Sequence, residues 1–488
     1  MTILNKRNAI INMDPEEFRK LGHNLVDQIS DFLISLPNRP LTRAETPSQV
    51  RRLLNQRKLP EEGANAEQLL NDVATLLFDH SLFNGHPKFW GYITASPAPI
   101  GILADLLAAS INPNLGAWLL SPVASEIEHQ SIRWIAEMVG FPTDCGGILV
   151  TGGNMANFVG FLAARHNFTT KEQIYDLRKL RLYASDETHT WIHKAVDMYG
   201  LGKESVSWVR TDNNQKIDLN ALKQQIEQDI RDGFQPFMVI GTAGSVSTGV
   251  VDPLPEISKI CKEYNLWFHV DGAYGAFAAV LPDASEDLKG LALADSVALD
   301  PHKWLYTPLE AGCALIREKT ILRDTFSYHP PYYKFDEVKS EPAISFVDYG
   351  PQNSRGFRAL KVWLSLCHAG RSGYIKMISD DINLASYLYD LVDKEPELEA
   401  LTHNLSITTF RYAPETPDKD ENERESYLNE LNTEILTRLQ EGGEAFVSNA
   451  VINGKYVLRA CIVNFRTNKE DIEALPKIIL RLGKEIDS

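Results

Sequence analysis

Short apolar runs alternate with helical patterns from about residue 86 to residue 374, and this alternation restricts the fold more than any other feature. Parallel strands need long connections, which are usually helices, so such an alternation is typical of a parallel sheet. The sequence therefore predicts an α/β fold with a mostly parallel sheet covered by helices, one of them over residues 157–166. The predicted buried strands are residues 147–150, 237–240, 266–270 and 296–299.

Segments of different pattern flank this region. Asp14 is placed to cap a helix whose apolar residues recur from Phe18 to Leu33, and a second helix is expected over residues 66–78. A polar loop over residues 414–426 and a hairpin turning at 453–454 are expected near the C-terminus. The predicted division is a helical arm over 1–85, a large domain over 86–374 and a small α+β domain over 375–488. Such an arm docks either on a partner subunit or on its own domain.

Charge and composition favour small molecules as partners. The chain has 488 residues and a net charge of −16, which argues against nucleic acid and anionic membranes. No secretion signal is visible, and the most apolar stretch, residues 100–111, is too short to cross a bilayer. The five cysteines lie far apart without metal-ligand spacing. We expect reduced thiols, a cytoplasmic location and no metal site.

Three elements point to one cofactor chemistry. Asp271 and Lys303 each follow a predicted strand, and Gly152-Gly153-Asn154 lies between a strand and a helix. A shielded lysine acts as an amine, and a carboxylate beside a pyridine nitrogen makes the ring an electron sink. A helix start binds phosphate through its backbone N–H groups. Neither the dinucleotide-binding glycine spacing nor a P-loop lysine is present, so a nucleotide site is a poor alternative.

Six motifs carry a resemblance that covers nearly the whole chain. Together they resemble the group II pyridoxal-phosphate decarboxylases, in the aromatic L-amino-acid decarboxylase branch. This resemblance implies a fold-type I pyridoxal-phosphate enzyme, similar to aspartate aminotransferase, and a homodimer. The motifs are PVASEIE at 122–128, TGGNMAN at 151–157, SDETH at 185–189, HVDGAY at 269–274, DPHKW at 300–304 and RGFRALKVW at 355–363.

The resemblance also implies roles for individual residues. Lys303 would hold pyridoxal 5'-phosphate as a Schiff base, and Asp271 would pair with the pyridine nitrogen. His189 would stack on one face of the ring, with Ala273 against the other face. The remaining cofactor contacts would be Gly153 and Asn154 at the phosphate and His302 beside the lysine.

Two positions depart from the family pattern. Asp300 stands where an asparagine is frequent, so a carboxylate would lie near the phosphate. The residue expected near the 3-hydroxyl of the cofactor falls on Ala243, with Thr242 as a substitute.

The resemblance places a catalytic tyrosine at Tyr332, in a proline-bordered segment over 328–350 that would act as a mobile lid. Decarboxylation requires an acid that protonates the substrate Cα, and relatives with phenylalanine at this position resemble aldehyde synthases. Tyr328 and Tyr333 leave the register of this match slightly open.

Substrate contacts are expected at Tyr92, Ile93 and Ser354. Plant relatives tend to have serine at the position of Ser354 for phenolic substrates and glycine for indolic ones, which favours tyrosine, dopa or phenylalanine over tryptophan. The leading function is α-decarboxylation of an aromatic L-amino acid to its amine. Two alternatives stay open: a decarboxylase for glutamate, histidine or diaminobutyrate, and a non-catalytic protein that acts through its dimer surface.

Overall fold

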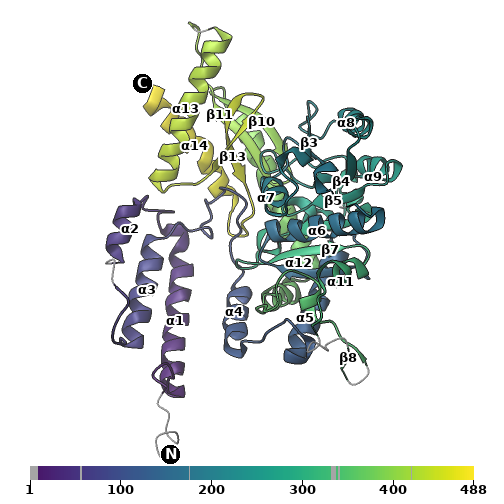
Figure 1. Ribbon diagram of the computed structural model, residues 1–488. Coiled ribbons are helices and arrows are strands. Elements are labelled where there is room, and N and C mark those ends of the chain that lie inside the picture. The colour runs from purple at the N-terminus through teal and green to yellow at the C-terminus, as the bar shows by residue number, and fades with distance from the viewer. Residues whose placement is uncertain are drawn as a thin grey trace, which may run out of the picture.

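The computed structural model describes residues 9–54, 58–174, 176–330, 337–338, 341–418 and 420–487. Tyr332, the predicted catalytic tyrosine, lies outside the described residues. Figure 1 shows a helical N-terminal part, a large part built around a sheet and a C-terminal part with its own small sheet. No helix of the described chain combines the length and the apolar character needed to cross a membrane.

A seven-stranded sheet forms the centre of the large part. Strand β7 pairs antiparallel with both of its neighbours, while the other neighbouring strands pair in parallel, which confirms a mostly parallel sheet. The predicted buried strands all belong to it. In spatial order the strands are β1 (Gly146–Val150), β7 (Gly312–Ile316), β6 (Ser296–Leu299), β5 (Trp267–Asp271), β4 (Gln235–Thr242), β2 (Leu180–Ser185) and β3 (Val206–Val209).

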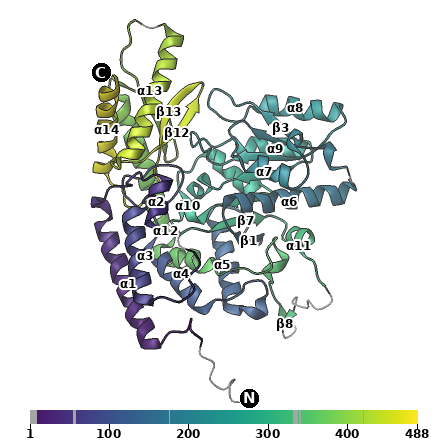
Figure 2. The same ribbon diagram turned by 60° about the vertical axis from the view of Figure 1, so that its left-hand side comes forward.

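Helices connect these strands and pack on the sheet (Figure 2). Helix α6 (Gly153–Glu172) begins four residues earlier than the predicted helix and ends six residues later, because a glycine pair and no side-chain cap starts it. The other helices around the sheet are α4 (Pro99–Ile111), α5 (Pro122–Met138), α7 (Trp191–Met198), α8 (Leu219–Arg231), α9 (Leu254–Glu263), α10 (Pro301–Trp304), α11 (Thr320–Phe326) and α12 (Ala359–Asp393).

The C-terminal part is an antiparallel sheet of four strands covered by helices. Its hairpin turns at Asn453 and Gly454, as predicted, and both residues have positive φ angles. The predicted polar loop over 414–426 is too long, because Asp420 and Glu423 form a capping box that starts a helix at Glu421. The elements are β10 (Leu398–Asn404), β11 (Ile407–Tyr412), α13 (Glu421–Gly442), β12 (Ser448–Ile452), β13 (Lys455–Cys461) and α14 (Lys469–Asp487).

The N-terminal part contains α1 (Pro15–Ser35), α2 (Pro47–Leu53) and α3 (Ala66–His80). Asp14 caps α1 by accepting a hydrogen bond from the backbone N–H of Glu16. Helices α1 and α3 lie side by side, and the connector reaches the small sheet part where the N–H of Leu41 donates to the carbonyl of Gly443 (Figures 1 and 2). The domain division stays a prediction, and its boundary between residues 374 and 375 falls inside α12.

Candidate active site

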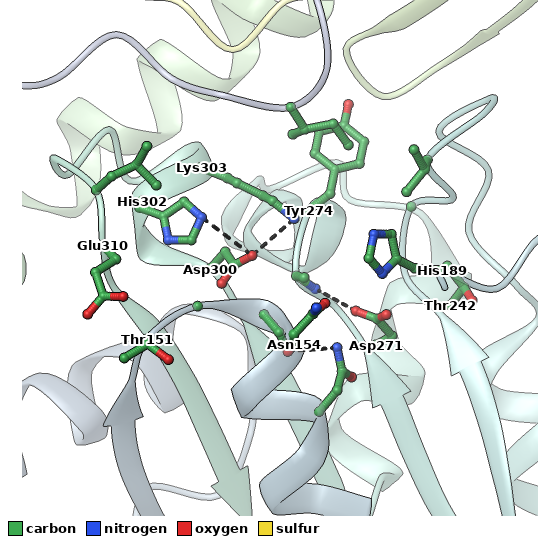
Figure 3. Close-up of a pocket in the computed structure, with 18 of the residues that line it drawn as sticks. Thr151, Asn154, His189, Thr242, Asp271, Tyr274, Asp300, His302, Lys303 and Glu310 are labelled. Atoms are coloured by element: carbon green, nitrogen blue, oxygen red, sulfur yellow. Dashed lines mark hydrogen bonds and ion pairs between the residues drawn. The ribbon is translucent and has the colours of Figure 1, made fainter. Parts of the chain in front are cut away.

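The carboxyl ends of several parallel strands meet at one edge of the large sheet, where a cavity of about 370 Å³ lies. Thr242 and Asp271 end β4 and β5, His189 follows β2, and Lys303 lies in the short helix α10 after β6 (Figure 3). Gly153 begins α6 after β1. Residues far apart in the sequence therefore line the same cavity because the topology brings their strands together.

Lys303 faces a carboxylate on its own helical turn. Its Nζ lies 3.0 Å from Oδ2 of Asp300, whose side chain is buried (Figure 3). His302 Nε2 lies 3.7 Å from the same oxygen, and its Nδ1 lies 2.8 Å from the carbonyl of Ala311. Burial lowers the pKa of His302, and Asp300 acts in the opposite direction. The amine of Lys303 is therefore held in a cavity with a proton acceptor beside it.

The turn that carries Lys303 is anchored from behind by a buried acid on α12. Asp381 Oδ2 accepts hydrogen bonds from Trp304 Nε1 at 2.9 Å and from the Tyr306 hydroxyl at 2.6 Å. Burial raises the pKa of Asp381 to about 7, although both donors act in the opposite direction. Lys303 thus lies beside two side chains that are fixed to the same carboxylate.

Asp271 is the buried carboxylate of the cavity floor. Its Oδ2 accepts a hydrogen bond from Trp191 Nε1 at 2.8 Å, and its Oδ1 accepts one from the backbone N–H of Ala273 at 3.2 Å. These two donors fix the plane of the carboxylate. Asp271 is thereby held in one orientation at the end of β5.

His189 lines the cavity and is exposed. The surrounding protein atoms desolvate the ring and lower its pKa, while Asp271 raises it. The backbone N–H of Trp191 lies 3.3 Å from His189 Nδ1, so a neutral ring carries its proton on Nε2. A flat ring that lines the cavity is suited to stacking on another ring.

The start of α6 provides a narrow cradle. A Cβ atom on Gly153 would lie 2.6 Å from Asp300 Oδ2, and Gly152 has a φ of +115°. No side chain caps this helix, so its first N–H groups are available to an anion. Thr242 Oγ1 and Asp300 Oδ1 are buried in the cavity wall without a hydrogen-bond partner among the described residues. The free N–H groups and the Thr242 hydroxyl fit a phosphorylated polar ring such as pyridoxal 5'-phosphate. The Asp300 carboxylate, which is paired with Lys303, is the one described group at this cradle that would repel the phosphate.

The structure gathers most of the predicted site residues in the cavity and places two of them, Tyr92 and Ser354, outside its described lining. Tyr92 is 58% exposed and its ring packs near Phe446, outside the described lining of the cavity. Ser354 is exposed and also lies outside that lining. Tyr332 falls outside the described residues, so these three roles stay predictions. The predicted residues that line the cavity are Ile93, Gly153, Asn154, His189, Asp271, Ala273, His302 and Lys303.

Sequence reasoning missed further lining residues. Glu187 lies in the SDETH motif, two residues before His189, and that spacing offered a signal. Leu309 and Glu310 follow Lys303 on the way to β7 and carry no motif. Of the two candidates near the 3-hydroxyl, Thr242 belongs to the described lining and Ala243 does not.

A shielded lysine above a strand-end carboxylate, with a glycine cradle at a helix start, is the arrangement of pyridoxal-phosphate enzymes. Residues 47–413 match the pyridoxal-dependent decarboxylase conserved domain. The chain is 34% identical over 477 residues to an aromatic-L-amino-acid decarboxylase of Bacillus atrophaeus, covering 98% of this chain and 97% of that protein. The chain therefore belongs to the pyridoxal-dependent decarboxylase family and is a carboxy-lyase that uses pyridoxal 5'-phosphate.

Solved structures agree with this assignment and with the predicted fold. The structure of Oryza sativa TDC with PLP and tryptamine has a TM-score of 0.91 at 25% identity, covering 98% of this chain and 100% of that chain. Rhodiola rosea 4-hydroxyphenylacetaldehyde synthase has a TM-score of 0.87 at 28% identity with the same coverage. The family inferred from the six motifs and the α/β fold inferred from the alternation of strand and helix patterns are both confirmed.

Proposed function

We propose that this enzyme removes the α-carboxyl group of an aromatic L-amino acid and releases the amine and carbon dioxide. The observation that carries the proposal is the cavity in which the Lys303 amine and the Asp271 carboxylate lie together. The substrate class is supported by the relative from Bacillus atrophaeus, an aromatic-L-amino-acid decarboxylase that matches nearly the whole chain.

Each residue of the cavity floor has one task in this proposal. Pyridoxal 5'-phosphate, when bound, withdraws electrons from the substrate Cα. Lys303 holds the cofactor through its amine, and Asp271 keeps a proton on the pyridine nitrogen. His189 and Ala273 confine the ring from its two faces, His302 lines the site beside Lys303, and the N–H groups of Gly153 and Asn154 bind the phosphate.

The substrate side of the site rests on residues near the entrance. Ile93 is buried against the cavity and would contact the aromatic side chain, with Tyr92 and Ser354 beside it. Tyr332 would supply the proton that Cα takes up after carbon dioxide leaves. A cavity closed from water favours this protonation, because a reactive carbanion is then not exposed to side reactions.

A homodimer and a cytoplasmic location are part of the same proposal. The arm and α4 expose apolar side chains in the single chain, and such patches mark protein interfaces. All five cysteines are free, as expected in a reducing compartment. The exposed apolar residues of helices α1, α3 and α4 are Phe18, Val26, Ile34, Leu69, Leu70, Val73, Leu77, Leu103, Leu106, Leu107 and Ile111.

The deciding experiment incubates the purified holoenzyme with single amino acids and measures both carbon dioxide and the organic product. We expect amines from tyrosine, dopa, phenylalanine or tryptophan. Release only from glutamate, histidine or diaminobutyrate would favour the non-aromatic alternative. If the purified protein shows no cofactor absorbance, and Lys303→Ala leaves its spectrum unchanged, the result would favour the non-catalytic alternative.

Tyr332→Phe tests the proton donor. Because the phenol is lost while the ring stays, amine formation should fall about 10²-fold. Cofactor absorbance should be unchanged, and the products are separated by chromatography to detect any aldehyde. An amine yield equal to that of the unmodified enzyme would remove Tyr332 from the mechanism. Tyr328→Phe is the matched comparison: Tyr328 is 93% exposed, and an unaltered yield in this variant would remove it as the alternative match for the catalytic tyrosine.

A further inference from the structure

A chain of hydrogen bonds runs through the buried core behind the cavity. Trp267 Nε1 lies 2.8 Å from Ser296 Oγ, and Ser296 Oγ lies 2.7 Å from His269 Nδ1. His269 Nε2 lies 2.8 Å from Asn157 Oδ1, and Asn157 Nδ2 lies 2.9 Å from the carbonyl oxygen of Gly153. We call these four side chains, Trp267, Ser296, His269 and Asn157, the buried hydrogen-bond chain. It joins β5 and β6 to the first turn of α6.

The direction of every bond in this chain is fixed by its two ends. The indole N–H of Trp267 only donates, and the carbonyl of Gly153 only accepts. Asn157 must therefore turn its amide nitrogen to Gly153 and its oxygen to His269. His269 then donates from Nε2, and its Nδ1 accepts the hydroxyl proton of Ser296. A neutral His269 satisfies all of these bonds.

The titration of His269 agrees with this assignment. Burial lowers its pKa to about 4, although the nearby Asp271 acts in the opposite direction. A second proton on Nδ1 would face the Ser296 hydroxyl, which already accepts a hydrogen bond from Trp267. The ring therefore stays neutral at any pH well above 4, and the directions of the hydrogen bonds do not change with pH there.

Close packing of α6 on β5 makes the connection possible. A Cβ atom on Gly160 would lie 2.7 Å from His269 Cε1, so any side chain there would push the helix away from the strand. Asn157 lies one turn before Gly160 on α6 and is almost fully buried. The absence of a side chain at Gly160 is what lets the amide of Asn157 reach the imidazole.

The last bond of the chain acts on the edge of the cavity. The carbonyl of Gly153 and the N–H of Asn154 belong to one planar trans peptide, so they point in opposite directions. Asn157 binds this carbonyl on the helix side. The N–H of the same peptide therefore points the other way, toward the start of α6, where Gly153 and Asn154 line the cavity. The chain thereby fixes the donor that an anion would meet at the start of α6.

We propose that Asn157, His269 and Ser296 are positioning residues for the phosphate group of the cofactor, acting through the Gly153–Asn154 peptide. They do not touch the reacting atoms. Their contribution is the orientation of one backbone donor before the cofactor arrives, which lowers the cost of binding the phosphate. The inference rests on the family's cofactor and is independent of the amino-acid substrate.

The test compares two ligands that differ only in the phosphate. Pyridoxine 5'-phosphate and pyridoxine lack the aldehyde, so neither reacts with Lys303, and their Kd values are measured by calorimetry after the cofactor has been removed. Asn157→Asp keeps the acceptor for His269 and replaces the donor to Gly153 with an oxygen. We expect the Kd of pyridoxine 5'-phosphate to rise about tenfold and that of pyridoxine to change less than about twofold.

Two further variants keep the test decisive. Thr408→Val is the matched control, because Thr408 donates a buried hydrogen bond to the Ala385 carbonyl in another part of the fold, and both Kd values should stay unchanged. Asn157→Asp also adds a negative charge near the phosphate, so Ser296→Ala decides the matter: it removes one hydroxyl, adds no charge and should give a selective loss of about threefold. An equal loss for both ligands in these variants, or no loss, would overturn the proposal.

Discussion

The cavity floor and the cavity entrance are built in different ways. On the floor, Asp271 is 7% exposed, ends a strand and accepts two hydrogen bonds. At the predicted substrate entrance, Tyr92 lies outside the described cavity lining; it is 58% exposed, has a positive φ angle and lies in a connecting segment. Strand ends hold a group in one orientation, while connecting segments tolerate change in sequence and length. From this comparison we expect the cofactor chemistry to depend on the sheet and the substrate choice to depend on segments outside it.

The largest expected effect comes from the floor. Asp271→Ala removes the negative charge that would keep the pyridine nitrogen protonated, so kcat should fall about 10³-fold and cofactor affinity should also fall. Steady-state kinetics at saturating cofactor and a cofactor titration measure the two effects separately. Full activity in this variant would contradict the role of Asp271 and the division between floor and entrance.

A smaller effect is expected for the support of the floor. The pKa of Asp381 is raised to about 7 in the folded protein, so its contribution to stability is complete below the ordinary carboxyl pKa and is lost as the pH rises through 7. Between pH 5 and pH 8, the free energy of unfolding should fall by about 2 kcal/mol more in the unmodified protein than in Asp381→Asn.

Urea unfolding at the two pH values measures this difference. The asparagine keeps an oxygen that accepts from Trp304 and Tyr306 but does not titrate, so it isolates the charge from the hydrogen bonds. Identical pH dependence in the two proteins would show that Asp381 does not change its protonation in this range.

The smallest effect is expected at the entrance. Ser354→Gly removes one hydroxyl, so the ratio of kcat/KM for tyrosine to that for tryptophan should fall about threefold to tenfold. The cofactor affinity should not change, since Ser354 does not line the described cavity. A change in cofactor affinity with no change in the ratio of kcat/KM values would show that Ser354 supports the cofactor and does not contact the substrate.

Much of the floor was predictable from the sequence for a physical reason. Buried parallel strands are short apolar runs, and the residue after such a run must lie at the carboxyl edge of the sheet. This rule, with the family motifs, predicted that Asp271 and Lys303 would share one cavity. His189, which the family motif alone predicted, also lines this cavity, four residues after the end of β2.

Other features had no comparable signal. The cap at Asp420 was hidden in a polar segment whose acidic residues are typical of both a loop and a helix start. Leu309 and Glu310 reach the cavity through the path of a connection, which no periodicity records. The buried hydrogen-bond chain depends on distances between side chains on α6, β5 and β6, so Asn157 became recognisable only in three dimensions.

Strand β7, which is antiparallel to its neighbours in the seven-stranded sheet, restricts the insertions and deletions that this enzyme tolerates. Because β7 is antiparallel to β6, the chain leaves the cavity edge at Leu299 and must re-enter the sheet at the same edge at Gly312. There the backbone passes so near Gly152 that a Cβ on Gly312 would lie 2.5 Å from it. Residues 300–311, which include Lys303, are thus held at both ends by neighbouring strands. We expect an insertion or deletion in this segment to be harmful, and we expect length variation in connections away from the cavity.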